Sequence, residues 1–136
     1  MKKTNYLRKG SGEFIAFAIL APLICSLVVV MVAYVQFSIS LHELTKALSV
    51  ASRSAVICKS LEDAESQGIL VAQSSIDSSN MSNIYVDIEF IGSNTEWKKG
   101  ELVSVTIYAD IETITPYIIS GTRKKQMIMC IENDNS

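Results

Sequence analysis

One uncharged stretch near the N-terminus limits what this chain can fold into. Phe14–Val35 spans 22 residues without a charged side chain, and Ser26 is its one clearly polar residue. As an α-helix this stretch would be roughly 33 Å long, enough to cross the ~30 Å hydrocarbon core of a lipid bilayer. A helix in a soluble protein normally keeps a polar stripe, and the rest of a 136-residue chain offers too little apolar sequence to surround this one. We therefore predict a transmembrane helix over residues 13–36.

The charges on either side of this segment predict its orientation. Residues 1–12 form a basic tail with a net charge of +4, whereas residues 41–136 have a net charge of −5. The basic side chains of the tail are Lys2, Lys3, Arg8 and Lys9. The positive-inside rule then places the N-terminus in the cytoplasm and exports the chain beyond about Phe37. The mildly acidic exported part gives no reason to expect a nucleic-acid partner.

The apolar run is also too long for a cleaved secretory signal. Such signals have an apolar region of about 7 to 15 residues followed by a small-residue cleavage site. Here the run is longer and no convincing site follows it. We expect a single-pass anchor in the cell (inner) membrane.

The helical pattern continues past the apolar segment. Apolar residues recur at spacings of three and four from Phe37 to Cys58, and no Gly or Pro interrupts the chain between Pro22 and Gly68. We predict that residues 37–59 extend the same helix outside the membrane, giving about 45 helical residues in all, or roughly 67 Å. Pro22 removes one backbone hydrogen bond within the membrane and predicts a modest bend.

Residues 60–131 are predicted to form a small exported α+β domain. Ser60 is a suitable N-cap for a second helix that reaches about Ser79. Apolar and polar residues then alternate as in half-buried strands. These strands are predicted at residues 84–90, 103–111 and 125–131. A loop at 116–121 precedes the last strand, and residues 132–136 form a polar tail. A three-stranded antiparallel sheet of this kind has one apolar face, which the apolar face of the extended helix would cover.

The cysteines leave two alternatives open. Cys25 lies within the apolar run, whereas Cys58 and Cys130 both lie in the part predicted to be exported. In an oxidising compartment these two would form a disulfide, closing a large loop and stabilising the fold by about 4 kcal/mol. The alternative is a pair of free, buried thiols.

The sequence offers no set of residues for catalysis or metal binding. His42 is the one histidine and has no Cys or His at ligand spacing, so we expect a surface residue. Gly10 and Gly12 follow no strand and do not form a phosphate-binding loop. Trp97 and the two lysines after it lie at a predicted hairpin tip, which is either simply exposed or a contact for a partner or lipid. We predict no enzyme activity, no cofactor and no small-molecule substrate.

Several short motifs together resemble one family. The basic tail ends in Gly, Glu13-Phe14 opens the apolar helix, and Pro22 lies within it. An Ala-x-Arg motif (51–53) stands near the helix end, and a Val-x-Val motif (103–105) lies in a strand. This arrangement resembles the TadE-like pseudopilins of the Flp/Tad type IVb pilus systems. The acid stands one helical turn earlier, relative to the proline, than is usual in that family.

The resemblance implies a minor pilin-like subunit that enters the cell membrane by its helix and joins or primes a pilus. It implies cleavage by a prepilin peptidase after Gly10 or Gly12, and a contact between Glu13 and a neighbouring subunit. The implied partners are membrane lipid, other pilin-like subunits, the pilus assembly platform and the prepilin peptidase. The alternative is an unprocessed single-pass adaptor whose exported domain binds another envelope protein.

Overall fold

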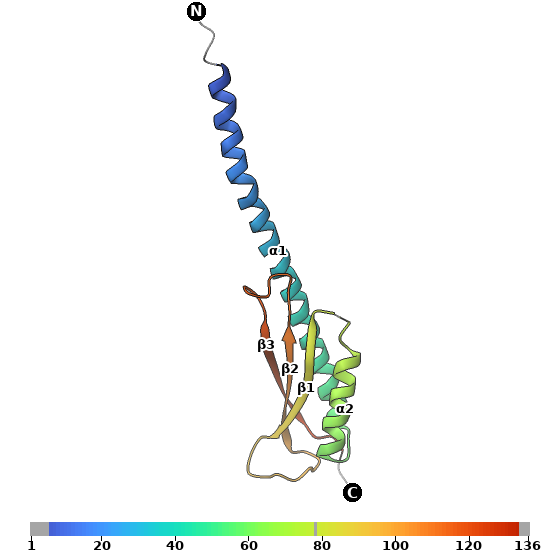
Figure 1. Cartoon of the computed structure of the whole chain (residues 1–136). Helices are drawn as coiled ribbons and strands as arrows, with labels where there is room; N and C mark the ends of the chain where they lie inside the picture. The colour runs from blue at the N-terminus through green and yellow to red at the C-terminus, as the bar shows by residue number, and fades with distance from the viewer. Residues whose placement is uncertain (1–5, 78, 134–136) are drawn as a thin grey trace, which may run out of the picture.

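One long helix is the spine of the molecule. The structure, a computed structural model, describes residues 6–77 and 79–133. The elements are α1 (Tyr6–Val56), α2 (Leu61–Ser74), β1 (Met81–Phe90), β2 (Leu102–Ile111) and β3 (Gly121–Cys130). The N-terminal half of α1 projects away from the rest of the chain, and its C-terminal half packs with α2 and the sheet (Figure 1). The predicted α+β fold, with a long N-terminal helix, a second helix and a three-stranded antiparallel sheet, is confirmed.

Helix α1 is longer than predicted at its start and shorter at its end. It begins at Tyr6, inside the predicted tail. Each glycine there makes the helix about 1 kcal/mol less favourable, and this cost is small compared with the hydrogen bonding gained by extending the long helix that follows. Glu13 therefore lies about two turns inside the helix rather than in its first turn. The helix ends at Val56 instead of 59 and continues across Pro22. The bend at Pro22 stays a prediction.

The end of α1 is capped by distant parts of the chain. The last carbonyls of a helix lack partners within it. Here the backbone N–H of Glu132 donates to the Val56 carbonyl (2.9 Å), and the Asn133 amide donates to the Ile57 carbonyl (3.1 Å). The indole N–H of Trp97 donates to the next carbonyl, that of Cys58 (2.9 Å). Residues 132 and 133, predicted to belong to a polar tail, are thus part of the fold.

The sheet has the order β1-β2-β3, and β2 is the central strand. Its inward-facing side chains are fully buried on the face of the sheet where α1 packs against β2 and β3 and where α2 packs against β1. They are Val103, Val105, Ile107, Ala109 and Ile111. Helix α2 presents three buried small residues, Ala64, Gly68 and Ala72, so it can approach β1 closely. A Cβ atom added to Gly68 would lie 3.4 Å from Cγ1 of Val86.

Several element boundaries differ from the sequence prediction, and β1, for example, begins at Met81 rather than at residue 84. Strand β3 begins at Gly121, four residues earlier than predicted. Its first half is exposed on both faces and shows no apolar alternation, so the sequence pattern does not identify these residues as a strand. Helix α2 ends at Ser74 rather than Ser79. Its predicted N-cap is confirmed, since the Ser60 hydroxyl accepts a hydrogen bond from the Asp63 backbone N–H (3.2 Å).

Candidate membrane and subunit interface

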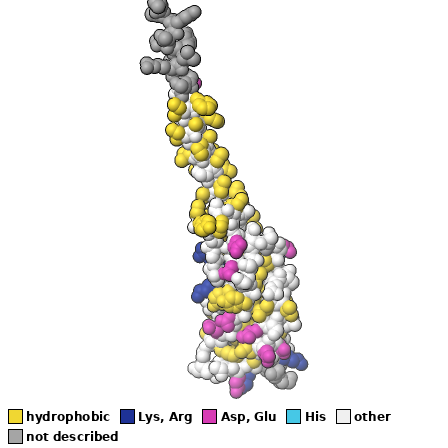
Figure 2. Space-filling model, in the orientation of Figure 1, with side chains coloured by type: hydrophobic (Ala, Val, Ile, Leu, Met, Phe, Trp, Pro, Cys, Tyr) yellow, Lys and Arg dark blue, Asp and Glu magenta, His cyan; other side chains and the backbone are white. Residues whose placement is uncertain are grey.

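The apolar segment of α1, residues 14–35, forms a stalk that the rest of the chain leaves uncovered except at its last turn. Within the described part of the chain, no side chain from 14 to 32 is buried. Phe14, for example, is 73% exposed. Figure 2 shows apolar side chains covering the visible face of the stalk. Among the described residues this is the one helix long and apolar enough to cross a membrane, and none of its most apolar window is buried inside the fold. A core helix would be buried, so this alternative does not hold.

The polar groups of the stalk are compatible with lipid. The Ser26 hydroxyl donates to the Leu23 carbonyl of the same helix (2.8 Å). A hydroxyl satisfied in this way can lie in a bilayer without a partner from another chain. The hydroxyl of Ser26 therefore leaves no unsatisfied hydrogen-bond donor on the apolar surface of the stalk.

Glu13 is the exception, at the N-terminal end of the stalk. It is exposed, and no hydrogen bond or ion pair joins it to another described residue. Gly12 beside it is also exposed, and a Cβ atom there would meet nothing within 4 Å. Both glycines predicted as cleavage sites, Gly10 and Gly12, lie inside α1, so a peptidase would have to unwind this turn. The carboxylate of Glu13 is free to meet a partner from outside the chain.

The stripe of α1 that faces the domain begins inside the stalk. Its first four residues follow one another at spacings of four, three and four. They are Ala33, Phe37, Ser40 and Leu44. Ala33, Ser40 and Leu44 are buried, and the guanidinium of Arg123 in β3 lies 5.2 Å from the centre of the half-buried Phe37 ring. The domain therefore reaches the last turn of the apolar segment.

The loop between β2 and β3, residues 112–120, lies against α1 at the same level. We call it the junction loop. The backbone N–H of Ile114 donates to the side-chain oxygen of Gln36 (3.2 Å), one residue beyond the stalk. Figure 1 shows this loop at the end of the domain that faces the stalk. The exposed fractions of Ile114, Tyr117 and Ile118 are 61%, 100% and 65%. The sequence pattern predicts only a connecting loop at 116–121, although three large apolar side chains around a proline are themselves a signal of an exposed contact surface.

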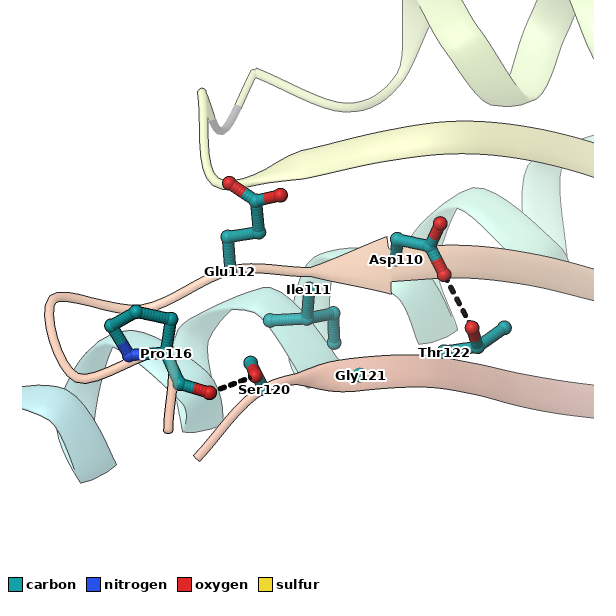
Figure 3. Close-up of a pocket in the computed structure, with 7 residues that line it drawn as sticks. All are labelled: Asp110, Ile111, Glu112, Pro116, Ser120, Gly121 and Thr122. Carbon is teal, nitrogen blue, oxygen red and sulfur yellow. Dashed lines mark hydrogen bonds between the residues drawn. The ribbon is translucent and has the colours of Figure 1, made fainter. Parts of the chain in front are cut away.

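A shallow depression of about 330 Å³ opens beside the junction loop (Figure 3). Its lining residues are Asp110, Ile111, Glu112, Pro116, Ser120, Gly121 and Thr122. The Asp110 carboxylate accepts hydrogen bonds from the Asn83 amide (2.8 Å) and the Thr122 hydroxyl, and these two bonds hold its pKa below the usual value. The Ser120 hydroxyl donates to the Pro116 carbonyl. Both hydroxyls are thus engaged in local structure, as Figure 3 shows.

No metal centre can be built from the described residues, since none of their His, Cys, Asp and Glu side chains form a group of three that could hold an ion. His42 is exposed, as predicted.

Comparison of the chain with protein families, curated proteins and solved structures finds no match.

Of the two alternatives left open for Cys58 and Cys130, the structure has the free thiols, although Cys130 is exposed rather than buried, and Cys25 is free as well. Alternation along the end of β3 explains this. Ile131 is buried toward the helices, so Cys130 before it faces the opposite, exposed side of the sheet. The half-buried Cys58 thiol instead donates to the Ser54 carbonyl (3.3 Å). Burial, followed by the charge of Asp63, raises the pKa of the Cys58 thiol.

Trp97 is not at an exposed hairpin tip, and this prediction was wrong. The indole is half-buried, packs edge-on against Phe90 with ring centres 6.2 Å apart, and donates to the Cys58 carbonyl (2.9 Å). Cys58 lies beyond the far end of α1, so the tryptophan is at the opposite end of the domain from the stalk. It holds the hairpin against the domain. The neighbouring Lys98 forms an ion pair with Glu96.

Proposed function

We propose that this chain is a minor pilin-like subunit, resembling the TadE-like pseudopilins, of a Tad-type (type IVb) pilus or a related secretion system. One observation carries the proposal: a single helix serves both as an uncovered apolar stalk and as the spine of a small α+β domain. A subunit that is stored in a membrane and then packs into a bundle of similar subunits needs one helix that is apolar on its outside at one end and carries a folded domain at the other. Its role is assembly by helix packing and partner binding.

The proposed location is the cell membrane, with the N-terminus in the cytoplasm and the domain outside. Basic residues precede the stalk, whereas the domain that follows is mildly acidic. This asymmetry is the usual determinant of orientation for a single span.

Glu13 is the proposed contact between subunits. Lipid is as apolar as the stalk, so burying apolar side chains gives little drive for association, and packing together with specific polar contacts must select the partner. An uncompensated carboxylate moved into a helix bundle is costly unless a cation meets it. Because no described residue pairs with Glu13, a basic group of a neighbour, such as an N-terminal amine, would supply that cation.

The test is the intact mass and the N-terminal sequence of the chain recovered from membranes, with and without the host's prepilin peptidase. Loss of the first 10 or 12 residues only when the peptidase is present is the expected result. A full-length chain in both hosts contradicts processing.

A full-length chain in both hosts would favour the second candidate function, an unprocessed single-pass envelope adaptor. One observation favours it: α1 runs without interruption through Gly10 and Gly12, which leaves no extended segment there for a peptidase.

The contact at Glu13 has its own test. We expect Glu13→Ala to remain in the membrane fraction after alkaline extraction but to bind other pilin-like subunits at least about thirtyfold more weakly in co-purification, since removing one partner of a desolvated charge pair costs about 2 kcal/mol or more. Glu89→Ala, which removes an exposed carboxylate from β1, is the matched control. Equal recovery of partners with both variants contradicts the proposed role of Glu13.

A further inference from the structure

The junction loop, residues 112–120, lies at a depth that the stalk defines. If residues 14–35 fill the ~30 Å hydrocarbon core, then Gln36 lies about 1.5 Å further along the helix, at the inner edge of the headgroup layer. That layer is roughly 5 to 8 Å thick on each side of the bilayer. The backbone of Ile114 is hydrogen-bonded to the Gln36 side chain (3.2 Å), so the loop is at headgroup level whenever the stalk spans the membrane.

The side chains that the loop exposes suit this layer. Ile114 and Ile118 are mostly exposed, and Tyr117 is exposed over its whole surface. None of the three belongs to the hydrophobic core of the described residues, and in water they would form an apolar patch. Tyrosine is enriched at membrane interfaces because its ring enters the apolar boundary while its hydroxyl stays hydrated.

The loop itself is stiffened from within. The Thr113 hydroxyl donates to the Ile119 carbonyl, and the backbone N–H groups of Ile118 and Ile119 both donate to the Thr115 carbonyl (3.0 and 3.1 Å). These bonds close a compact turn around Pro116. The exposed apolar side chains are therefore held out from the domain by a fixed backbone.

Basic side chains follow immediately. Arg123, Lys124 and Lys125 at the start of β3 are all exposed, and the Arg123 guanidinium lies beside Phe37 of α1, one residue beyond Gln36. Figure 2 shows Lys and Arg side chains on the domain close to the base of the stalk. Cations at this height lie where lipid phosphates lie.

We propose that the junction loop is a second membrane contact, in which Ile114, Tyr117 and Ile118 enter the outer interfacial layer of the bilayer that α1 spans. The inference rests on the proposed membrane insertion of the stalk. It extends that function, because two contacts fix the tilt of the domain on the membrane, whereas a single helix leaves the tilt free.

The native tryptophan makes a direct test feasible. Trp97 is the one tryptophan of the chain and lies at the end of the domain away from the stalk, so it is an internal reference. The full chain is reconstituted into phosphatidylcholine vesicles whose acyl chains are brominated near the headgroup, because bromine quenches tryptophan on contact. Three proteins are compared: the native chain, Tyr117→Trp and Tyr34→Trp. Both substituted tyrosines are exposed, so the fold tolerates the larger ring.

We expect native fluorescence to be unchanged by bromine, and the fluorescence added by Tyr117→Trp and by Tyr34→Trp to be quenched at least twofold. Quenching of Tyr34→Trp but not of Tyr117→Trp overturns the loop contact and leaves the membrane span intact. Absence of quenching in both overturns the membrane span itself. Quenching of native Trp97 also overturns the proposal, because the domain would then lie along the bilayer. A blue-shifted, unquenched Tyr117→Trp signal would indicate that a second protein chain covers the loop instead.

Discussion

Replacing Gly68 by alanine should stabilise the domain, against the usual expectation for a buried residue in close contact. Gly68 lies inside α2, where glycine is about 0.8–1.0 kcal/mol less favourable than alanine. The added Cβ atom would lie 3.4 Å from Cγ1 and 3.8 Å from Cβ of Val86, which is ordinary van der Waals contact. We therefore expect Gly68→Ala to raise the free energy of unfolding by about 1 kcal/mol.

Larger side chains at this position should have the opposite effect. The space beside Val86 accommodates one methyl group, so Gly68→Leu forces α2 away from β1 and should cost about 1 to 3 kcal/mol. The two variants together bracket the distance between the helix and the strand.

The assay is urea unfolding of the full chain in detergent micelles, followed by the fluorescence of Trp97. This side chain contacts both Phe90 and the end of α1, so its emission reports docking of the domain even where the stalk stays helical. With a slope of roughly 1 to 3 kcal/mol per molar urea, the Gly68→Ala midpoint should rise by roughly 0.3 to 1 M. A midpoint lowered by Gly68→Ala would refute the reasoning, since it would mean that α2 and β1 are closer than the structure shows.

Three further predictions follow from individual sites. Leu44→Ala removes a fully buried side chain between α1 and the sheet and should lower the free energy of unfolding by about 2 to 5 kcal/mol in the same urea assay. Hydrogen bonds from the Asn83 amide and the Thr122 hydroxyl lower the pKa of Asp110 in the folded state, so its carboxylate adds stability above its unfolded pKa, and this stability is lost as the pH falls through the folded value. Between pH 5 and pH 3 the native chain should therefore lose more stability than Asp110→Asn. Equal losses in the two proteins would contradict this. At pH 8 without reductant, alkylation followed by mass spectrometry should label the exposed Cys130 several-fold faster than Cys58, whose pKa is raised mainly by burial; failure to label either would point to a disulfide.

The long-range architecture could be predicted from the sequence because two periodicities carry it. A 22-residue uncharged run, followed by apolar residues every three or four positions, requires a helix that changes surroundings along its length. The alternation around Val105 and Val86 predicts strands with one buried face, and the structure buries both side chains. The N-cap at Ser60 was predictable because it depends on local hydrogen bonding alone.

The features that could not be predicted depend on contacts between distant parts of the chain. The indole of Trp97 is hydrogen-bonded to a carbonyl 39 residues away, and the Ile114 backbone to a side chain 78 residues away. No local pattern specifies such pairs. Cys130 illustrates a different case: the alternation that predicts Ile131 to be buried also directs Cys130 outward, so the pattern itself argued against the disulfide.

The continuity of α1 determines on which side of the stalk a neighbour can approach. Each residue of an α-helix turns the chain by 100°, and Ala33, the first residue of the stripe that faces the domain, comes 20 residues after Glu13. The two positions are therefore separated by roughly 160° around the helix axis. Glu13 faces away from the side on which its own domain lies, so a second stalk can reach the carboxylate without passing beneath that domain. One residue inserted near Gln36 would turn the domain by about 100° relative to Glu13. In the proposed assembly, the length of this helix would therefore set the rotational order in which successive subunits present their domains.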